Sequence, residues 1–120
     1  MKSSTNRRKQ AHRRGARAEW KSALFLFLKG YRIVAIRHRT KLGEIDLIAR
    51  KGDLAVMVEV KARPTVQQAV DSVTATARRR INNAADLWLA KQKDAARLSV
   101  RFDIIAVCPW KLPVHFIDAF

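Results

Sequence analysis

Cysteine, acidic residues and long apolar runs are all scarce in this chain of 120 residues. The single cysteine, Cys108, excludes an internal disulfide and is typical of a protein in a reducing cytoplasm. No apolar run reaches the roughly 18 residues that a membrane helix needs. The basic N-terminus is not followed by the apolar region of a secretory signal peptide. We therefore expect a cytoplasmic protein that does not contact a membrane.

Several common site motifs are missing as well. The chain contains no Gly-rich phosphate-binding loop and no Cys/His spacing typical of zinc sites. These absences argue against a nucleotide hydrolase and against a zinc-binding module. There are no internal repeats, and the length suits one domain with a single hydrophobic core. We expect a basic, flexible tail over residues 1–12 and a single domain over residues 13–120.

A strong excess of positive charge is the clearest feature that the chain does have. Lys and Arg number 25 against 10 acidic residues, which gives a net charge of +15 and a pI near 11.3. A domain this basic repels itself unless it meets a polyanion, and nucleic acid is the first candidate. Two arginine clusters could contact phosphate groups, although each could also be an ordinary solvated surface. The candidates in them are Arg37, Arg39, Arg78, Arg79 and Arg80.

Three of the acidic residues lie in two apolar runs, 43–49 and 56–61, that are typical of β-strands. They are Glu44, Asp46 and Glu59. Acidic residues are depleted in strands, and a buried carboxylate must be paired, protonated or bound to a metal. Because two neighbouring strands make the same unfavourable choice, the sequence predicts a shared site.

The two runs are predicted to form a hairpin, because Gly52-Asp53 between them suits a type II′ turn. In that register Asp46 faces Glu59, and Glu44 faces Lys61. Side-chain alternation then places these four residues on one face and apolar residues on the other, namely Ile45, Leu47, Val58 and Val60. A turn centred one residue earlier would pair Glu44 with Glu59, and the acidic residues would still share a face.

Two adjacent carboxylates repel each other unless a positive charge lies between them. Mg²⁺ binds one or two carboxylates and keeps several waters, one of which Lys61 could orient for attack on a phosphodiester. The alternative is a surface hairpin in which Asp46 or Glu44 makes a weak ion pair with Lys61. Glu19, beside the apolar stripe of the first helix, could be a third metal ligand or could pair with a nearby arginine.

The remaining pattern predicts an α/β sandwich with a mixed sheet of about five strands, in the order αβββαββ. Helices are expected over 13–29 and 73–92, strands over 31–39, 43–49, 56–61, 98–108 and 114–117, and either a loop or a short helical turn over 66–70. The apolar stripe of the first helix is expected to comprise Ala16, Trp20, Ala23, Leu24, Phe27 and Leu28. In the fourth strand, Asp103 is expected to pair with Arg101, and Cys108 to be a buried, inert thiol.

Five motifs, taken together, resemble those of a known family. They are Gly15-Ala16-Arg17-Ala18-Glu19, the run 43–49 (Gly-Glu-Ile-Asp-Leu-Ile-Ala), the run 58–63 (Val-Glu-Val-Lys-Ala-Arg), Arg101-Phe102-Asp103 and Asp118-Ala119-Phe120. With them the chain, from Gly15 almost to its end, resembles the YraN family of small bacterial proteins, which is related to PD-(D/E)XK nucleases and to archaeal Holliday junction resolvases. The proline of the superfamily signature is absent, since Ile45 precedes Asp46. The resemblance implies a restriction-endonuclease-like three-layer sandwich.

The resemblance also implies a phosphodiesterase site that depends on Mg²⁺ or Mn²⁺. By position, Asp46, Glu59 and Glu19 would hold the metal, Lys61 would handle the attacking water, and Glu44 lies nearby. On this basis we expect an endonuclease-like protein that acts on structured or branched DNA rather than RNA. A homodimer is compatible with the resemblance, because resolvases make paired incisions. The alternative is a non-catalytic module that binds DNA or RNA, for example one associated with the ribosome.

Overall fold

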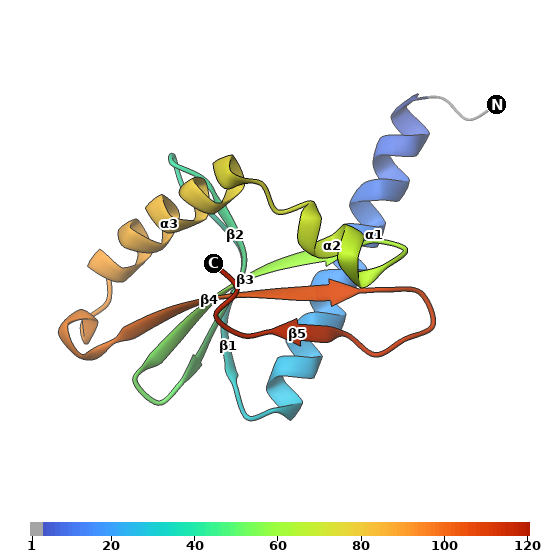
Figure 1. Ribbon diagram of the computed structural model, residues 1–120. Helices are drawn as coiled ribbons and strands as arrows, with labels where there is room; N and C mark the ends of the chain where they lie inside the picture. The colour runs from blue at the N-terminus through green and yellow to red at the C-terminus, as the bar shows by residue number, and fades with distance from the viewer. Residues whose placement is uncertain (1–3) are drawn as a thin grey trace.

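The computed structural model describes residues 4–120, with side chains described from Gly15 onward (Figure 1). Three α-helices, one short 3-10 helix and five strands follow one another along this part of the chain. Their bounds are α1 (Ser4–Leu28), β1 (Arg32–Arg39), β2 (Glu44–Lys51), β3 (Leu54–Ala62), α2 (Val66–Asp71), α3 (Ala75–Ala90), η1 (Ala95–Arg97), β4 (Ser99–Val107) and β5 (Val114–Phe116).

The observed order differs from the predicted one at two places. Residues 66–70, which suited either a loop or a helical turn, belong to the short helix α2, whose N-cap Thr65 accepts a hydrogen bond from the Gln68 amide. Helix α1 begins at Ser4, earlier than the expected start at Arg13. Residues 4–12 of the expected tail are therefore helical, and residues 1–3 lie outside the described part of the chain.

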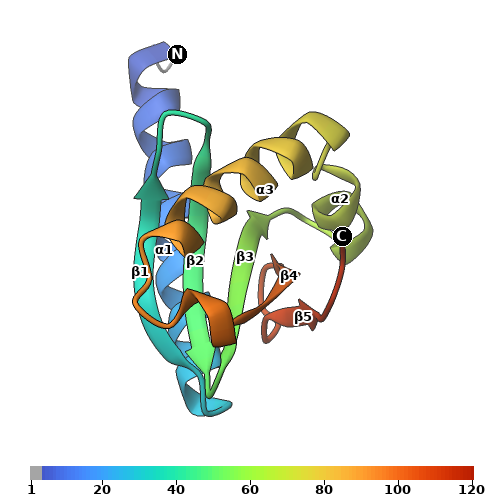
Figure 2. The ribbon, with the colours of Figure 1, turned by 90° about the vertical axis from the view of Figure 1, so that its left-hand side faces the viewer.

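The five strands form one mixed sheet in the spatial order β1-β2-β3-β4-β5. Strands β1, β2 and β3 form an antiparallel meander, β4 runs parallel to β3, and β5 is antiparallel to β4. The chain passes from β3 to β4 through α2 and α3, as a parallel pair requires. Figure 2 shows α1 and α3 on opposite faces of the sheet. The predicted α/β sandwich with a five-strand mixed sheet and flanking helices is confirmed.

The hairpin that joins β2 to β3 has the predicted register. Lys51 pairs with Leu54 across the turn, and the pairing continues regularly to Leu47 and Val58. Gly52 has φ of +61°, which is the left-handed conformation that the first central residue of a type II′ turn adopts. The register therefore brings the acidic ends of β2 and β3 to the same end of the sheet.

Helix α1 buries a different face from the predicted one. Ala23 of the predicted stripe is buried, but Trp20, Leu24, Phe27 and Leu28 are 59–74% exposed. The face that packs on the sheet carries mainly small residues, namely Ala18, Ser22 and Ala23, together with Leu26. Small side chains let the helix backbone approach the sheet closely, and the larger apolar residues are left on the outside. Glu19, expected beside the predicted stripe, lies on this buried face.

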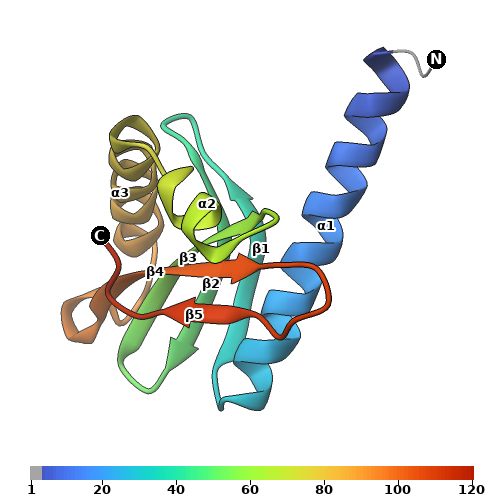
Figure 3. The ribbon, with the colours of Figure 1, turned by 45° about the vertical axis from the view of Figure 1, so that its right-hand side comes forward.

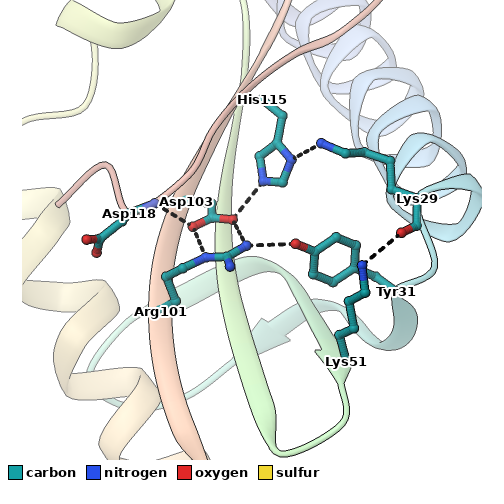
Figure 4. A network of polar contacts seen from close by, with 7 residues as sticks. All are labelled: Lys29, Tyr31, Lys51, Arg101, Asp103, His115 and Asp118. Carbon is teal, nitrogen blue, oxygen red and sulfur yellow. Dashed lines mark hydrogen bonds and ion pairs between the residues drawn. The ribbon is translucent and has the colours of Figure 1, made fainter.

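A buried polar network fastens the C-terminal strands to the end of α1 (Figure 4). The Asp103 side chain is fully buried and accepts hydrogen bonds from Arg101 Nη2 at 2.7 Å, from His115 Nε2 at 2.7 Å and from the Asp118 amide at 2.9 Å. Lys29 Nζ lies 2.8 Å from His115 Nδ1. This confirms the predicted Arg101–Asp103 pair and extends it to β5. Cys108 is also buried, as expected.

The network sets the ionisation of Asp103. Burial alone would raise its pKa, but the hydrogen bonds from His115, Arg101 and the Asp118 amide outweigh burial and lower the pKa to about 2. Because this value is below that of the unfolded chain, ionised Asp103 stabilises the fold at neutral pH. That contribution is fully present above about pH 4 and is lost as the pH falls toward 2.

We predict that Asp103→Ala lowers the free energy of unfolding by about 3–5 kcal/mol at pH 7, because Arg101 and His115 lose their buried partner. Urea denaturation followed by circular dichroism measures the change. Asp71→Ala is the matched control, since Asp71 is exposed and bonds only Gln67 at 2.8 Å among the described contacts; we expect a change within about 0.5 kcal/mol. Equal stability of the two variants would contradict a structural role for the network.

Candidate carboxylate site

Asp46 and Glu59 meet at the end of the sheet where β3 ends. Two hollows open onto this carboxylate pair, and both acidic residues line both of them. The first hollow, of about 390 Å³, lies beside α1, and the second, of about 410 Å³, lies beside the start of α3. The predicted meeting of the two acidic side chains is therefore present in the structure, and it is reachable from both faces of the sheet.

The regular pairing of β2 with β3 ends at Leu47 and Val58, next to the two acidic residues. Leu47, Val58 and Val60 share one face, as predicted, and pack in the core beside α1, but Ile45 packs in the core beside α3. The predicted face of Ile45 is thus wrong, because β2 loses strict alternation between residues 45 and 47. At this point Asp46 Oδ2 accepts a hydrogen bond from the Val60 amide at 2.9 Å. The Asp46 carboxylate thus accepts the bond that a backbone carbonyl of β2 would accept in a regular ladder, and this bond holds Asp46 beside Glu59.

Burial and repulsion act together on Asp46. Removal from water raises its pKa, the charge of Glu59 and a hydrogen bond with Glu59 raise it further, and the Val60 amide and Lys61 oppose the rise; the result is about 7. Near neutral pH the carboxylate pair therefore holds a proton in part of the molecules. A bound cation would displace that proton, since it favours the ionised form of both acidic groups.

Lys61 and Glu19 lie at the α1 side of the pair. Lys61 Nζ is 3.3 Å from Glu59 Oε1, and both Lys61 and Glu19 line the first hollow. Glu19 Oε2 accepts a hydrogen bond from Arg37 Nε at 2.6 Å. Burial raises the pKa of Glu19, the bond from Arg37 lowers it, and the charge of Asp46 raises it. The four predicted site residues are therefore neighbours, with Glu19 held by an arginine.

Glu44 lies at the α3 side of the pair. It lines the second hollow with Thr74, Thr76 and Arg80, and its Oε2 is 3.3 Å from Arg39 Nε. The turn before it must approach α3 closely, since a Cβ atom at Gly43 would lie 2.8 Å from the Arg80 carbonyl oxygen. Gly43 thus allows the β1–β2 turn to bring Glu44 and α3 together.

The two carboxylates of Asp46 and Glu59 have the chemistry to bind a divalent cation without a third acidic ligand. Mg²⁺ in proteins uses one or two carboxylates and fills its octahedron with waters, so Asp46 and Glu59 suffice. Among the described residues, no three side chains of the acidic, His or Cys type are arranged to hold a metal. Glu19 belongs to the same hollow, but one of its oxygens is bound to Arg37.

The arginines predicted to contact phosphate have different surroundings. Arg37 is mostly buried against Glu19, whereas Arg39 is 71% exposed. Arg78 lies over the Phe120 ring at 5.4 Å, Arg79 is exposed, and Arg80 lines the second hollow. Of these three arginines, Arg80 is the one that lines a hollow together with the carboxylate pair.

Sequence reasoning missed three cations at a neighbouring hollow. Arg17, Lys21 and Arg63 line this third hollow together with residues from the ends of β3 and β4. A signal was present, since Arg17 and Lys21 are one helical turn apart and Arg63 follows Lys61 by two residues. The position of the hollow could not be read from it, because that position depends on the parallel pairing of β3 with β4.

Fold and site together define the class of this molecule. It is a small α/β protein with a carboxylate pair at the end of a mixed sheet, a lysine beside the pair and a strongly basic composition. Among the described residues, no helix combines the length and apolar character that crossing a membrane would require.

The chain belongs to Uncharacterised protein family UPF0102, whose model matches residues 18–107. It is 63% identical to a UPF0102 protein of Rhizobium johnstonii over 94% of this chain and 93% of the relative. It is 60% identical to one of Agrobacterium fabrum over 97% and 95% of the two chains, and 58% identical to one of Mesorhizobium japonicum over 94% and 90%. The resemblance to the YraN family, which is the same family, is thus confirmed.

We predict that Asp46→Asn stabilises the protein at pH 8 and not near pH 4, measured by urea denaturation in EDTA. The pKa of Asp46 is about 7 in the folded protein and 3.8 in the unfolded chain. The folded protein therefore loses stability as the pH rises from about 4 to 7, because the unfolded chain ionises first. Asparagine avoids that loss, worth up to about 4 kcal/mol at pH 8, and keeps an oxygen for the Val60 amide. Asp53→Asn, in the exposed hairpin turn, is the control. A gain that does not depend on pH would contradict the raised pKa.

Proposed function

We propose that this protein is a Mg²⁺-dependent endonuclease that acts on structured or branched DNA. The observation that carries the proposal is the forced meeting of Asp46 and Glu59, with Lys61 Nζ 3.3 Å from the Glu59 carboxylate. A pair of buried like charges costs folding free energy, which a bound divalent cation would offset. The net charge of +15 supports a polyanionic substrate.

In this proposal, each side chain has a distinct task. Asp46 and Glu59 would hold the cation, which would supply stabilisation of charge on the phosphate and lower the pKa of an attacking water. Lys61 donates a hydrogen bond to that water and orients it toward phosphorus. Glu19 lines the same hollow, and Arg37 holds one of its carboxylate oxygens.

Basic side chains around the pair would hold the DNA backbone. Arg80 adjoins the pair beside α3, and Arg39 and Arg79 are exposed at the surface. Contacts of this kind position the nucleic acid without reading its sequence. We therefore propose recognition of backbone shape rather than of base order.

The second candidate function is a non-catalytic module that binds DNA or RNA. The bond between Glu19 and Arg37 favours it, since one predicted metal ligand is already paired. A wild-type protein that binds nucleic acid but cuts no substrate with any metal would support this candidate. A ribosome-associated protein would in addition prefer folded RNA and would be indifferent to changes at Asp46 and Glu59.

We predict that wild-type protein cleaves labelled branched DNA with Mg²⁺ or Mn²⁺ and not with EDTA. Glu59→Ala should abolish cleavage and leave salt-dependent binding within about twofold, because phosphate contacts supply that affinity. Lys61→Ala should slow cleavage about a hundredfold or more. The control Asp86→Ala changes an exposed acid of α3 and should cleave normally.

A second measurement does not depend on activity. Mg²⁺ or Mn²⁺ should raise the melting temperature of wild-type protein and of Asp86→Ala, but not that of Glu59→Ala, because only the intact pair binds the cation. Absence of a metal effect on wild-type stability at millimolar metal, together with absence of cleavage, would overturn the proposal.

A further inference from the structure

The hollow lined by Arg17, Lys21 and Arg63 lies beside the carboxylate site. It shares Ala18, Ala62 and Arg63 with the first hollow of that site. Its other walls come from Pro64 after β3 and from Val107, Cys108 and Pro109 at the end of β4. A groove without any acidic lining residue thus continues from the carboxylate pair across the ends of the parallel strands. Ligands in α/β sheets commonly bind outside these ends.

A fully exposed tryptophan lies one residue beyond the lining of this groove in the chain. Trp110 is the next residue after Pro109, in the turn between β4 and β5, and its side chain is completely exposed to solvent. Figure 3 shows this turn at the end of β4, where the chain reverses into β5. Strand β5 pairs with β4 from Ala106 to Ile104, which fixes the base of the turn.

The backbone at Trp110 makes the choice of tryptophan informative. Its φ is +63°, in the left-handed region that favours glycine or asparagine and disfavours a bulky side chain. The indole also gains no stabilisation from packing, because the ring is exposed to solvent. A large aromatic residue that neither local conformation nor the core favours is available to a ligand, and such backbone outliers cluster at functional positions.

We infer that Trp110 and the groove of Arg17, Lys21 and Arg63 bind single-stranded DNA. A cationic groove that tracks the backbone, combined with an aromatic ring that stacks on a base, is the chemistry of single-strand binding. A duplex fits this surface less well, because its bases are stacked on each other and offer no free face to the indole. The inference deepens the proposed function and rests on it for the chemistry at the carboxylates: the strand led into that site would be unpaired, as at a branch or a flap.

Fluorescence anisotropy of a labelled oligothymidylate of about 20 nucleotides, titrated with full-length protein in EDTA, tests the stacking contact. We predict about tenfold weaker binding for Trp110→Ala and for Trp110→Leu, and near wild-type binding for Trp110→Phe, which keeps an aromatic face. Leu112→Ala is the matched control, because Leu112 is 81% exposed in the same turn and has no ring to stack. All these variants should keep the wild-type melting temperature, since both residues are exposed.

The same titrations with a duplex of equal length separate the two substrate classes. The duplex should bind wild-type protein and Trp110→Ala equally. Arg63→Gln and Lys21→Gln should weaken single-strand binding, and each should reduce the dependence of log K on log salt by about 0.7. Wild-type affinity of Trp110→Ala for the single strand, or an equal loss on the duplex, would overturn the inference.

Failure of this inference is distinguishable from failure of the proposed function. Binding in EDTA does not require the cation. The Trp110→Ala change should therefore weaken single-strand binding by the same factor in protein that carries Glu59→Ala as in wild-type protein. If no metal supports cleavage but this difference persists, the groove binds single strands and the nuclease proposal is wrong. If cleavage occurs but Trp110→Ala binds and cuts like wild type, the nuclease proposal stands and the groove inference is wrong.

Discussion

The repulsion between the carboxylates of Asp46 and Glu59 is the constraint on which the site depends. Two adjacent strands present acidic side chains where the sheet ends, and burial keeps water from separating their charges. The fold tolerates the pair because the Val60 amide, Lys61 and a proton each reduce the cost. The same features leave a position that a cation would occupy favourably, so the folding cost and the proposed chemistry have one origin.

The hydrophobic core and the buried polar network connect this end of the sheet to the rest of the molecule. On the α1 side, Leu47, Val58 and Val60 continue the core up to the acidic residues. Toward β5, the buried Asp103 fixes Arg101 and His115, and through His115 it reaches Lys29 at the end of α1. This network joins β4 to β5 and so orders β4, whose end helps to form the basic groove. The acidic residue of the network and those of the carboxylate pair thus differ in ionisation, since bonded Asp103 has a lowered pKa and Asp46 a raised one.

Helix α1 shows how the same periodicity can be consistent with two structures. Its large apolar residues repeat at helical spacing, yet Trp20, Leu24 and Phe27 face solvent, while small residues face the sheet. Large apolar residues more often lie in the core, so this exposed row departs from their usual placement. Spacing indicates that a helix is amphipathic, but the side that packs depends on how closely its backbone can approach the partner.

Local sequence determined the elements, the β2–β3 hairpin and the acidic pair, because these depend on turn chemistry and alternation between residues near in the chain. It also indicated the Arg101–Asp103 pair, since both residues lie on one strand. Only the tertiary structure decided that Ile45 leaves its expected face, that Arg37 is bound to Glu19 and that Arg63 lies beside Arg17 and Trp110's turn. These facts depend on contacts between distant segments, on the parallel pairing of β3 with β4 and on the approach of α1 to the sheet, which no periodicity within one segment encodes.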